Sequence, residues 1–510
     1  MNTTTQSQSQ SQKTTHRNTS ASAASTQEMA FGTPFEHYNL SGSFDEMFNK
    51  VDGPRPHYNM LFSQLQELPL EQLERRQLAA DRIFLNHGIT FTVYSDDKGT
   101  ERIFPYDLLP RIITKAEWSR LEEGLSQRIT ALNLFIHDIY HDQKVLKDKI
   151  IPRELVESCH HFRSEMMGVD VPGDVYLSIV GSDLIRLTDG AFAVLEDNLR
   201  VPSGVSYMLA NRQIMKRVFP DIFRKYGVRS ISHYSRLLLS KLQKLSPRPQ
   251  DEPNIVLLTP GAYNSAYFEH TFLAREMGIA LVEGRDLEIQ DDIVYMRTTA
   301  GRRRVDVIYR RIDDDFLDPE AFRKDSLLGV PGLFNAYKGG NVALSNAIGT
   351  GFADDKAVYA YVPDLIKYYL DQDSIIPNVE TFLLEDDTQR KHVTTNIDKL
   401  VVKAVGESGG YGILIGPHST KKQQSDFCKQ IEKNPRNYIA QPTIDLSRVP
   451  CFVEGQLEPR HVDLRPFILN GTDGVDIVPG GLTRVALTRG SLVVNSSQGG
   501  GSKDTWVLNK

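Results

Sequence analysis

The segment SDLIRLTDGAFAVLEDNLRVPSG, residues 182–204, places polar side chains at the ends of two apolar stretches. Its pattern predicts a β-hairpin with a turn at TDG, residues 188–190. Alternate residues of a strand share one face, so Glu196 and Asn198 lie together, and Asp183 belongs to the partner strand. Carboxylate and amide oxygens are typical ligands of hard cations such as Mg²⁺. Considered alone, however, the cluster is more simply explained as a solvated turn.

The sequence before this hairpin predicts a polar tail and a mainly helical region. Residues 1–30 are polar, repetitive and poor in large apolar groups, which predicts disorder because little burial offsets the entropy of ordering. Residues 31–172 read mainly as helix, with a short strand at 89–94. The segment 117–140 carries apolar residues at helical spacing, and its charged face is expected to be solvated.

The sequence after the hairpin predicts helices to about residue 245 and then an α/β unit. A strand in NIVLLTPG, residues 254–261, precedes a helix at 265–278 that ends at Gly278. A second strand follows at 279–284, which completes a βαβ pattern. Strand ends of such sheets face ligand crevices, so this unit is a candidate for binding a substrate.

Charged side chains follow the next strand of the unit, in VDVIYRRIDDD, residues 305–315. Arg310 and Arg311 could bind a substrate carboxylate, and Asp313 and Asp314 could hold an amine. A surface salt-bridge cluster explains them equally well. Four residues after the LTPG turn could line the same crevice: Asn264, Tyr267, Glu269 and His270. A lone histidine in such a place is more often structural than catalytic.

A glycine-rich segment, GESGGYG at 406–412, separates two predicted strands, LVVKAV and GILIG. Glycine lets backbone N–H groups approach phosphate oxygens closely, and Lys403 on the first strand would add a charge. A flexible hairpin turn is the alternative. The segment is not a Walker A loop, because no lysine follows its last glycine and a strand comes next. The strand YIAQP, 438–442, could offer backbone groups to an adenine edge, which alone is a weak signal.

Together, these segments resemble the ATP-grasp ligases. Five segments occur in the same order as in that family: GFADDKAVYAYVPDLIKYYLDQDSIIPNVETF, LVVKAVGESGGYGILIG, YIAQP, HVDLRPFILNG and RVALTRGSLVVNSSQGGG. The later part of this run, with its D-x-R strand, is similar to glutathione synthetase. In that family an Asp strand and Glu-x-Asn would follow, whereas here they precede the rest, at 183–198. The chain therefore resembles the circularly permuted ATP-grasp family, type 2, which is distantly similar to glutathionylspermidine synthetase. The resemblance covers residues 31–510.

The resemblance implies an α+β fold: a circularly permuted ATP-grasp fold with a Rossmann-like pre-ATP-grasp α/β domain and a helical N-terminal region. The implied division is a disordered polar tail at 1–30, a mainly helical region at 31–172, the permuted C-terminal part with the metal hairpin at 173–250, a pre-ATP-grasp-like α/β domain at 251–395 and nucleotide-binding lobes at 396–510. Residues 173–207 and 396–510 would build one site, because a sheet that lacked its central hairpin would expose unpaired edges.

The same likeness implies ATP and Mg²⁺ as cofactors and assigns residues to three sets. These are ATP contacts at Lys356, Lys403, Gly409, Gly410, Gly412 and Gln441; Mg²⁺ ligands at Asp183, Glu196 and Asn198; and groups near the transferred phosphoryl or the acceptor carboxylate at Arg484, Arg200 and Asn495. Gln441 stands where the adenine hinge more commonly has glutamate. These ligases also often have an arginine two residues before the metal Asp, where this chain has Gly181. That arginine would have to come from Arg186, Arg200 or Arg484.

The expected activity is an ATP-dependent ligation of a carboxylate to an amine through an acyl-phosphate, with small-molecule or peptide substrates. The alternatives are an ATP-binding regulator or scaffold without turnover, and a phosphotransferase that acts on a non-carboxylate acceptor. The net charge of −6 provides no bulk electrostatic case for nucleic acid or an anionic membrane. The three cysteines show no close pairing and are interpreted as reduced thiols, which predicts a cytoplasmic protein.

Overall fold

The computed structural model describes residues 34–36, 38–40, 42–49, 53–93, 100–248, 252–406, 412–494 and 499–510. The predicted tail at 1–30 lies outside these residues. Within them, helices are combined with mostly antiparallel strands, which fits an α+β fold.

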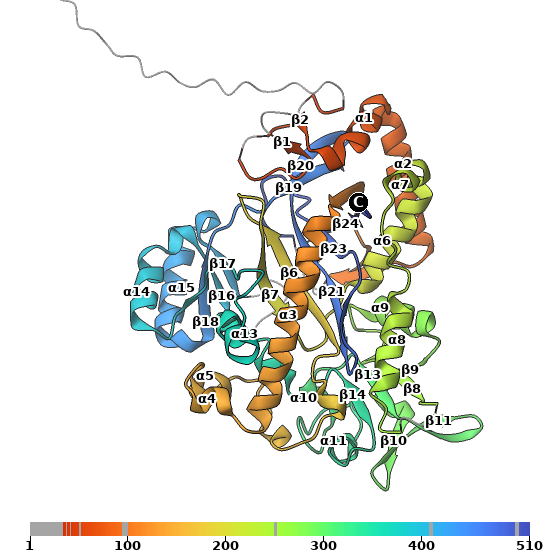
Figure 1. Cartoon of the computed structure of the whole chain (residues 1–510), viewed down its shortest axis with the longest axis vertical. Helices are drawn as coiled ribbons and strands as arrows, with labels where there is room; N and C mark the ends of the chain where they lie inside the picture. Colours follow the sequence, from red (N-terminus) through yellow and green to blue (C-terminus); the bar gives the residue numbers. More distant parts are fainter. Residues whose placement is uncertain are drawn as a thin grey trace, which may run out of the picture.

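The predicted hairpin is confirmed as β6 (Ile179–Arg186) and β7 (Phe192–Asn198), and β6 lies in the middle of a nine-stranded sheet (Figure 1). β6 pairs antiparallel with β20 (Gln456–Arg465) and with β21 (Phe467–Gly471). The predicted pairing between residues 173–207 and 396–510 is therefore confirmed. The other strands of the sheet are β5 (Tyr106–Ile113), β19 (Arg448–Val453), β22 (Gly474–Ile477), β23 (Leu482–Val485) and β24 (Gly501–Val507).

Strand β5 belongs to the region that the sequence marked as mainly helical. It pairs parallel with β24, and all eight of its residues are buried. A strand that is covered on both faces has no alternation of apolar and polar residues, so its sequence, YDLLPRII, carried no strand signal. Pro110 lies where the register with β24 shifts, which is a position that tolerates a proline.

The two faces of the central sheet carry separate cores. In β21, Ile468 belongs to one core, and its neighbours Phe467 and Leu469 belong to the other, because side chains of a strand alternate between faces. The first core contains α3 (Lys115–Tyr140), which confirms the helix predicted at 117–140. The second core contains α6 (Val205–Val218) and α8 (Tyr234–Lys244).

The predicted βαβ unit is confirmed as a four-stranded parallel sheet. β8 (Ile255–Leu258) leads into α9 (Tyr267–Met277), and the chain returns through Gly278, whose φ of 68° suits a glycine, to β9 (Ala280–Val282). β13 (Val307–Arg310) and β14 (Ala343–Ser345) complete the sheet. A separate antiparallel sheet contains β10 (Leu287–Gln290), β11 (Ile293–Thr298) and β12 (Gly301–Arg304).

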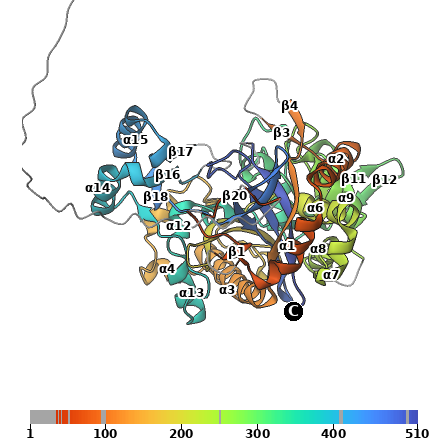
Figure 2. The same ribbon diagram turned by 90° about the horizontal axis from the view of Figure 1, so that it is seen from above.

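A smaller four-stranded sheet carries the predicted glycine hairpin. Its strands are β15 (Phe382–Leu383), β18 (Tyr438–Pro442), β16 (Leu400–Ala404) and β17 (Ile413–Ile415), with α14 (Asp387–Thr395) and α15 (Lys421–Lys433). β16 and β17 pair antiparallel, as expected for strands joined by a hairpin. Figures 1 and 2 both place this sheet on the side of the molecule away from α6 and α9.

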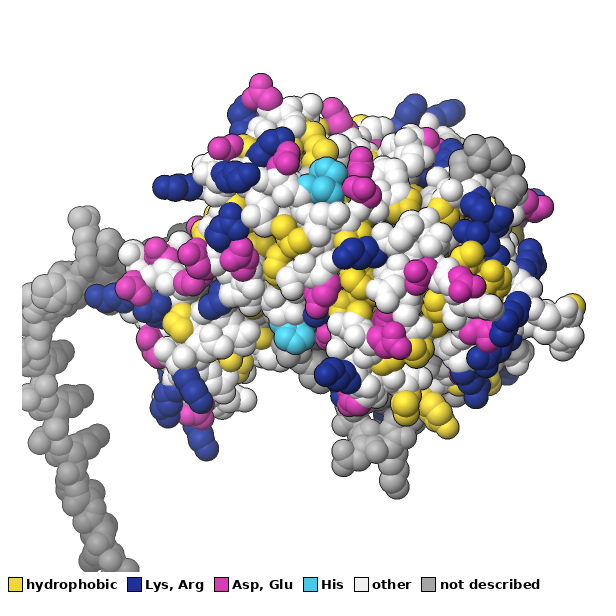
Figure 3. All heavy atoms as spheres, turned by 90° about the horizontal axis from the view of Figure 1, so that it is seen from below, with side chains coloured by type: hydrophobic (Ala, Val, Ile, Leu, Met, Phe, Trp, Pro, Cys, Tyr) yellow, Lys and Arg dark blue, Asp and Glu magenta, His cyan; other side chains and the backbone are white. Residues whose placement is uncertain are grey.

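The remaining elements cover these sheets. The helices are α1 (Asn59–Glu67), α2 (Leu70–Asn86), α4 (Lys144–Lys147), α5 (Arg153–Glu157), α7 (Pro220–Tyr226), α10 (Asp314–Leu317), α11 (Leu333–Lys338), α12 (Lys356–Tyr359) and α13 (Val362–Leu370), and the short strands are β1 (Phe48–Asn49), β2 (Gly53–Pro54), β3 (Thr90–Val93) and β4 (Thr100–Ile103). None of the helices in the described ranges combines the length and apolarity that a membrane span requires. On the face in Figure 3, acidic and basic side chains are interspersed.

Candidate nucleotide and metal site

The hairpin β6–β7 presents the three predicted metal ligands together. Asp183 stands opposite Glu196 in the strand register, and Asn198 stands opposite Gly181. The Asn198 side-chain amide donates a hydrogen bond of 3.0 Å to the carbonyl of Gly181. No hydrogen bond within the described part of the chain reaches Oδ1 of Asn198. Two carboxylates and one amide oxygen on adjacent positions are a donor set that suits Mg²⁺, so these residues fit the ion that the resemblance implies.

Two arginines from neighbouring strands bind Asp183. Nη2 of Arg465 lies 2.7 Å from Oδ2 of Asp183, and Nη2 of Arg484 lies 2.6 Å from the same oxygen. Arg484 also donates to both carboxylate oxygens of Asp463, at 3.0 Å from Nε. Burial alone would raise the pKa of Asp183, but Arg465 and Arg484 outweigh it and hold that pKa well below its usual range. Asp183 is therefore ionised and already compensated in charge.

Arg465 occupies the space that Gly181 leaves empty. A Cβ atom at Gly181 would lie 3.3 Å from Cδ of Arg465, so the missing side chain makes room for an arginine that comes from the adjacent strand β20. The sequence showed Arg465 in the D-x-R pattern at 463–465, but it gave no reason to place it beside Asp183. Arg186, which was one of the three arginines considered, forms ion pairs with Glu117 at 2.5 Å and Glu46 at 3.3 Å.

The two predicted ATP lysines approach the hairpin from different elements. Lys356, the first residue of α12, places Nζ 3.8 Å from Oε2 of Glu196. Lys403 on β16 is buried and donates a hydrogen bond of 2.7 Å to Oε1 of Gln441. Burial, opposed by Glu196 and Asp183 and assisted by Lys356, lowers the pKa of Lys403 to about 8. Lys356, Lys403, Glu196 and Asp183 are therefore close enough to interact electrostatically.

Some predicted contacts of this site fall outside the described residues. These are Gly409 and Gly410 in the glycine-rich segment and Asn495 before β24. Gly412 is described, with a φ of 65° that favours glycine. Gln441 pairs with Val401 in the register of β18 and β16, and its side-chain nitrogen donates to the hydroxyl of Thr381 at 3.0 Å.

The opposite face of the hairpin is anchored by a buried ion pair. Arg128 on α3 contacts Asp197 on β7, with 2.6 Å between Nη2 and Oδ2, and both side chains are buried. The expectation that the charged face of this helix is solvated is therefore wrong at Arg128. The sequence did indicate that Arg128 is buried, because this residue lies between Leu125 and Leu132 at the spacing of the apolar stripe.

Arg200 lies just beyond the hairpin and is held by two carboxylates. Its Nε donates to Asp354 at 2.7 Å, and its Nη1 lies 3.1 Å from both Asp313 and Nε2 of His161. Burial would lower the pKa of Arg200, but Asp354 and Asp313 outweigh it and raise that pKa. The sequence identified Asp313 and Arg200 separately, yet their contact joins strand ends of two different sheets.

The predicted arginine pair for a substrate carboxylate is committed to internal partners. Arg310 is buried and donates to the carbonyls of Asn346 and Ala347, both at 2.8 Å. Arg311 is also buried; it donates to the carbonyl of Pro202 at 2.7 Å and pairs with Glu269 at 3.2 Å. The two side chains form no open clamp, and the salt bridge that Arg310 forms with Asp314, at 2.7 Å, is buried in the interior and not at the surface.

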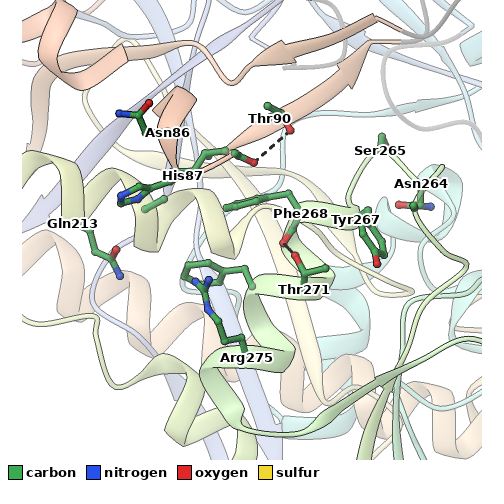
Figure 4. Close-up of a pocket in the computed structure, with 15 residues that line it drawn as sticks. Asn86, His87, Thr90, Gln213, Asn264, Ser265, Tyr267, Phe268, Thr271 and Arg275 are labelled. Carbon is green, nitrogen blue, oxygen red and sulfur yellow. Dashed lines mark hydrogen bonds between the residues drawn. The ribbon is translucent and has the colours of Figure 1, made fainter. Parts of the chain in front are cut away.

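The residues after the LTPG turn divide between the interior and a separate pocket. Glu269 and His270 are buried, and Nδ1 of His270 lies 2.8 Å from the hydroxyl of Thr259. Burial, and then Arg311, lower the pKa of His270 to about 2, so it is neutral and structural. Asn264 and Tyr267 line a pocket between α2, α6 and α9 (Figure 4).

Comparison with known sequences identifies relatives over most of the chain. The family model "Circularly permuted ATP-grasp type 2" matches residues 110–486. An uncharacterized protein of Synechocystis sp. is 52% identical over 473 residues, which are 93% of this chain and 98% of that protein. An uncharacterized protein of Mycobacterium tuberculosis is 52% identical over 478 residues, which are 93% of this chain and 86% of that protein.

A longer relative and a solved structure extend the comparison. "Putative glutamate--cysteine ligase 2-3" of Frankia alni is 40% identical over 490 residues, which are 96% of this chain and 56% of that protein. The apo structure of a glutathione synthetase like-effector from Globodera pallida aligns with a TM-score of 0.57 and 12% identity, over 86% of this chain and 98% of that one. At that identity the likeness concerns the fold alone. The resemblance found in the sequence is thereby confirmed, and the chain belongs to the circularly permuted ATP-grasp type 2 family.

Proposed function

We propose that this protein is an ATP-dependent carboxylate–amine ligase. One observation supports the proposal most directly: Glu196, on the hairpin with Asp183 and Asn198, lies 3.8 Å from Lys356, and its charge also acts on Lys403. Binding of a nucleotide alone would not require a complete set of metal ligands beside two lysines. The family and the ligase names of its Frankia relatives are consistent with this class of enzyme.

Each group has a defined task in this proposal. Mg²⁺-bound ATP, when present, supplies the γ-phosphoryl group and an electrophilic phosphorus. Lys403 and Lys356 would neutralise phosphate oxygens, and Asp183, Glu196 and Asn198 would hold the metal ion. Gly412 would lie next to the phosphates, and β18 with Gln441 would border the adenine. Positioning and neutralisation of charge are most of what phosphoryl transfer requires from a protein.

The arginines next to the hairpin would serve the acceptor carboxylate. Arg484 and Arg465 already bind carboxylates, and Arg200 lies two positions beyond Asn198. In the proposed reaction a substrate carboxylate oxygen attacks the γ-phosphorus and ADP leaves, which forms an acyl-phosphate. An amine then attacks the acyl carbon, the amide bond forms, and inorganic phosphate leaves with the former carboxylate oxygen. The substrates would be small molecules or peptides.

Analysis of products tests this function. The full-length protein is incubated with ATP, Mg²⁺ and a metabolite extract, and products are identified by mass spectrometry. A ligase releases ADP and inorganic phosphate in equal amounts and forms a new amide. A phosphotransferase forms ADP and a phosphorylated acceptor without free phosphate, and a scaffold forms neither. Either of the last two results would overturn the proposal.

The affinity for nucleotide should fall as the pH rises through about 8, because Lys403 has its pKa near that value in the free protein. Below this pH the ammonium group is charged and can bind a phosphate. Above it, affinity should decrease by up to about tenfold per pH unit, since binding must then take up a proton. Calorimetric titration with a non-hydrolysable ATP analogue, between about pH 6.5 and about pH 9.5, measures this dependence.

The matched control for this titration is Lys403→Arg, because a guanidinium stays charged over the whole range. Its affinity should show a much flatter pH dependence. If the wild-type protein and Lys403→Arg show the same pH dependence, Lys403 does not contact the nucleotide.

A further inference from the structure

A pocket of about 770 Å³ lies between α2, α6 and α9, and three distant parts of the chain surround it (Figure 4). Asn86 and His87 come from the end of α2, Gln213 comes from α6, and residues 262–275 contribute the loop before α9 and one face of that helix. Figures 1 and 2 both show these helices on the side of the molecule away from β16, β17 and β18. The pocket is therefore distinct from the nucleotide cluster.

The lining of this pocket favours an anion. Among the described residues that line it, none is Asp or Glu, although the chain has more acidic than basic residues. One lining residue, Arg275, has a permanent positive charge, and the amides of Asn86, Gln213 and Asn264 add N–H donors. Ser265 and Tyr267 add hydroxyl groups, whereas the hydroxyl of Thr271 already donates to the carbonyl of Phe268 at 2.8 Å. A ligand with a carboxylate would meet donors from several directions and no carboxylate among the lining residues.

Arg275 is available to a ligand in a way that the buried arginines are not. Its side chain is 74% exposed, and its ion pair with Glu276 is long, at 3.9 Å. Its guanidinium lies 5.6 Å from the centre of the Phe272 ring, a contact that orients it without using its donors. Arg310 and Arg311, by contrast, spend their N–H groups on internal carbonyls and carboxylates.

Aromatic side chains line another part of the pocket. The rings of Phe268 and Phe272, both lining residues, have centroids 5.8 Å apart, and Tyr207 lies 5.6 Å from Phe268 behind them. Covering such a surface with an apolar or planar group of a ligand is favourable and stabilises the complex. Polar groups that fix orientation beside an aromatic wall are the usual composition of a small-molecule site.

We propose that this pocket binds a small organic anion that carries a carboxylate on an aromatic or apolar body. Arg275 contacts the carboxylate, Asn86, Gln213 and Asn264 complete the polar side, and Phe268 and Phe272 contact the body of the ligand. This inference does not depend on the ligase chemistry. The opposite face of α9 is connected to the start of α6, which follows the hairpin β6–β7 in the chain, because Glu269 accepts hydrogen bonds from the N–H groups of Gly204 and Ser206, at 2.8 and 3.0 Å.

A pair of probes that differ in charge tests the proposal on the full chain without nucleotide. N-acetylphenylalanine carries the carboxylate, and N-acetylphenylalaninamide has the same body without the charge. Titration followed by ligand-observed NMR should show that the acid binds and that the amide binds at least about tenfold more weakly. Arg275→Gln should weaken binding of the acid by about tenfold and leave binding of the amide unchanged.

Two further variants separate this site from a general effect of charge. Gln213→Glu introduces a carboxylate from a different helix and should also weaken binding of the acid. Arg323→Gln is the matched control, because Arg323 also lies over a phenylalanine ring, 4.9 Å from that of Phe316, but pairs closely with Asp325 at 2.7 Å. It should leave binding unchanged. The proposal is overturned if the acid does not bind, if acid and amide bind equally, or if Arg323→Gln weakens binding as much as Arg275→Gln and Gln213→Glu do.

Discussion

Replacing Glu196 with glutamine should lower the rate of Mg²⁺-dependent ADP release by about 100- to 1,000-fold, as removal of one preorganised electrostatic group at a reacting centre typically does. The melting temperature of the metal-free protein should be nearly unchanged. The Glu196 side chain is 30% exposed, and its ion pair with Lys356 is 3.8 Å long. Such a pair contributes little to stability. Glutamine also keeps the shape of the side chain and loses only its charge.

A control variant from the same hairpin strengthens this experiment. Asp189 lies in the turn at the other end, where its carboxylate accepts a hydrogen bond from the N–H of Ala191 at 2.9 Å. Asp189→Asn keeps an oxygen acceptor and should leave ADP release unchanged. If Glu196→Gln instead lowers the melting temperature by several degrees and leaves ADP release intact, Glu196 supports the fold and does not hold a metal ion.

The elements that could be predicted from the sequence are those encoded by local patterns. The apolar stretches and the TDG turn of β6 and β7, the glycine that ends α9 and the apolar stripe of α3 each depend on neighbouring residues. Strand β5 could not be predicted because burial of both faces removes the alternation. The pairing of β6 with β20 and β21 joins segments far apart in the chain, and only the order of the family-like segments indicated it.

The residues of the candidate site also include some that the sequence could predict and some that it could not. Glu196, Asn198 and Lys403 were identified because their residue types suit cations or phosphates and follow recognisable strands. Arg310 and Arg311 have equally suitable types, but several of their partners lie far away in sequence, at Pro202, Glu269 and Asn346. The sequence does not distinguish an arginine whose N–H groups are all bound inside the protein from an arginine that faces a ligand. Only the tertiary contacts distinguish them.

Removing the Glu46 carboxylate should destabilise the protein by about 3–5 kcal/mol, because loss of one partner leaves buried charges uncompensated. Glu46 is 2% exposed and binds Arg111 on β5, with 2.8 Å between Nε and Oε2. It also lies 3.3 Å from Nε of Arg186 on β6 and accepts a hydrogen bond of 2.6 Å from Ser447. Glu46→Ala would leave both guanidiniums without this partner. Unfolding by denaturant at neutral pH measures the loss.

The pH dependence of this difference provides a sharper test. Burial would raise the pKa of Glu46, but Arg111 and Arg186 outweigh it and lower that pKa from 4.5 to about 2. Its carboxylate therefore stabilises the folded state fully above pH 4.5, and the contribution is lost as the pH falls towards 2. The difference between wild type and Glu46→Ala should shrink over that interval. The matched control is Glu71→Ala, which breaks a pair of the same chemistry with Arg75 at 2.6 Å on an exposed helix face. That variant should change stability little at any pH. If the two variants behave alike, the buried pair of Glu46 and Arg111 does not hold the N-terminal segment to the central sheet.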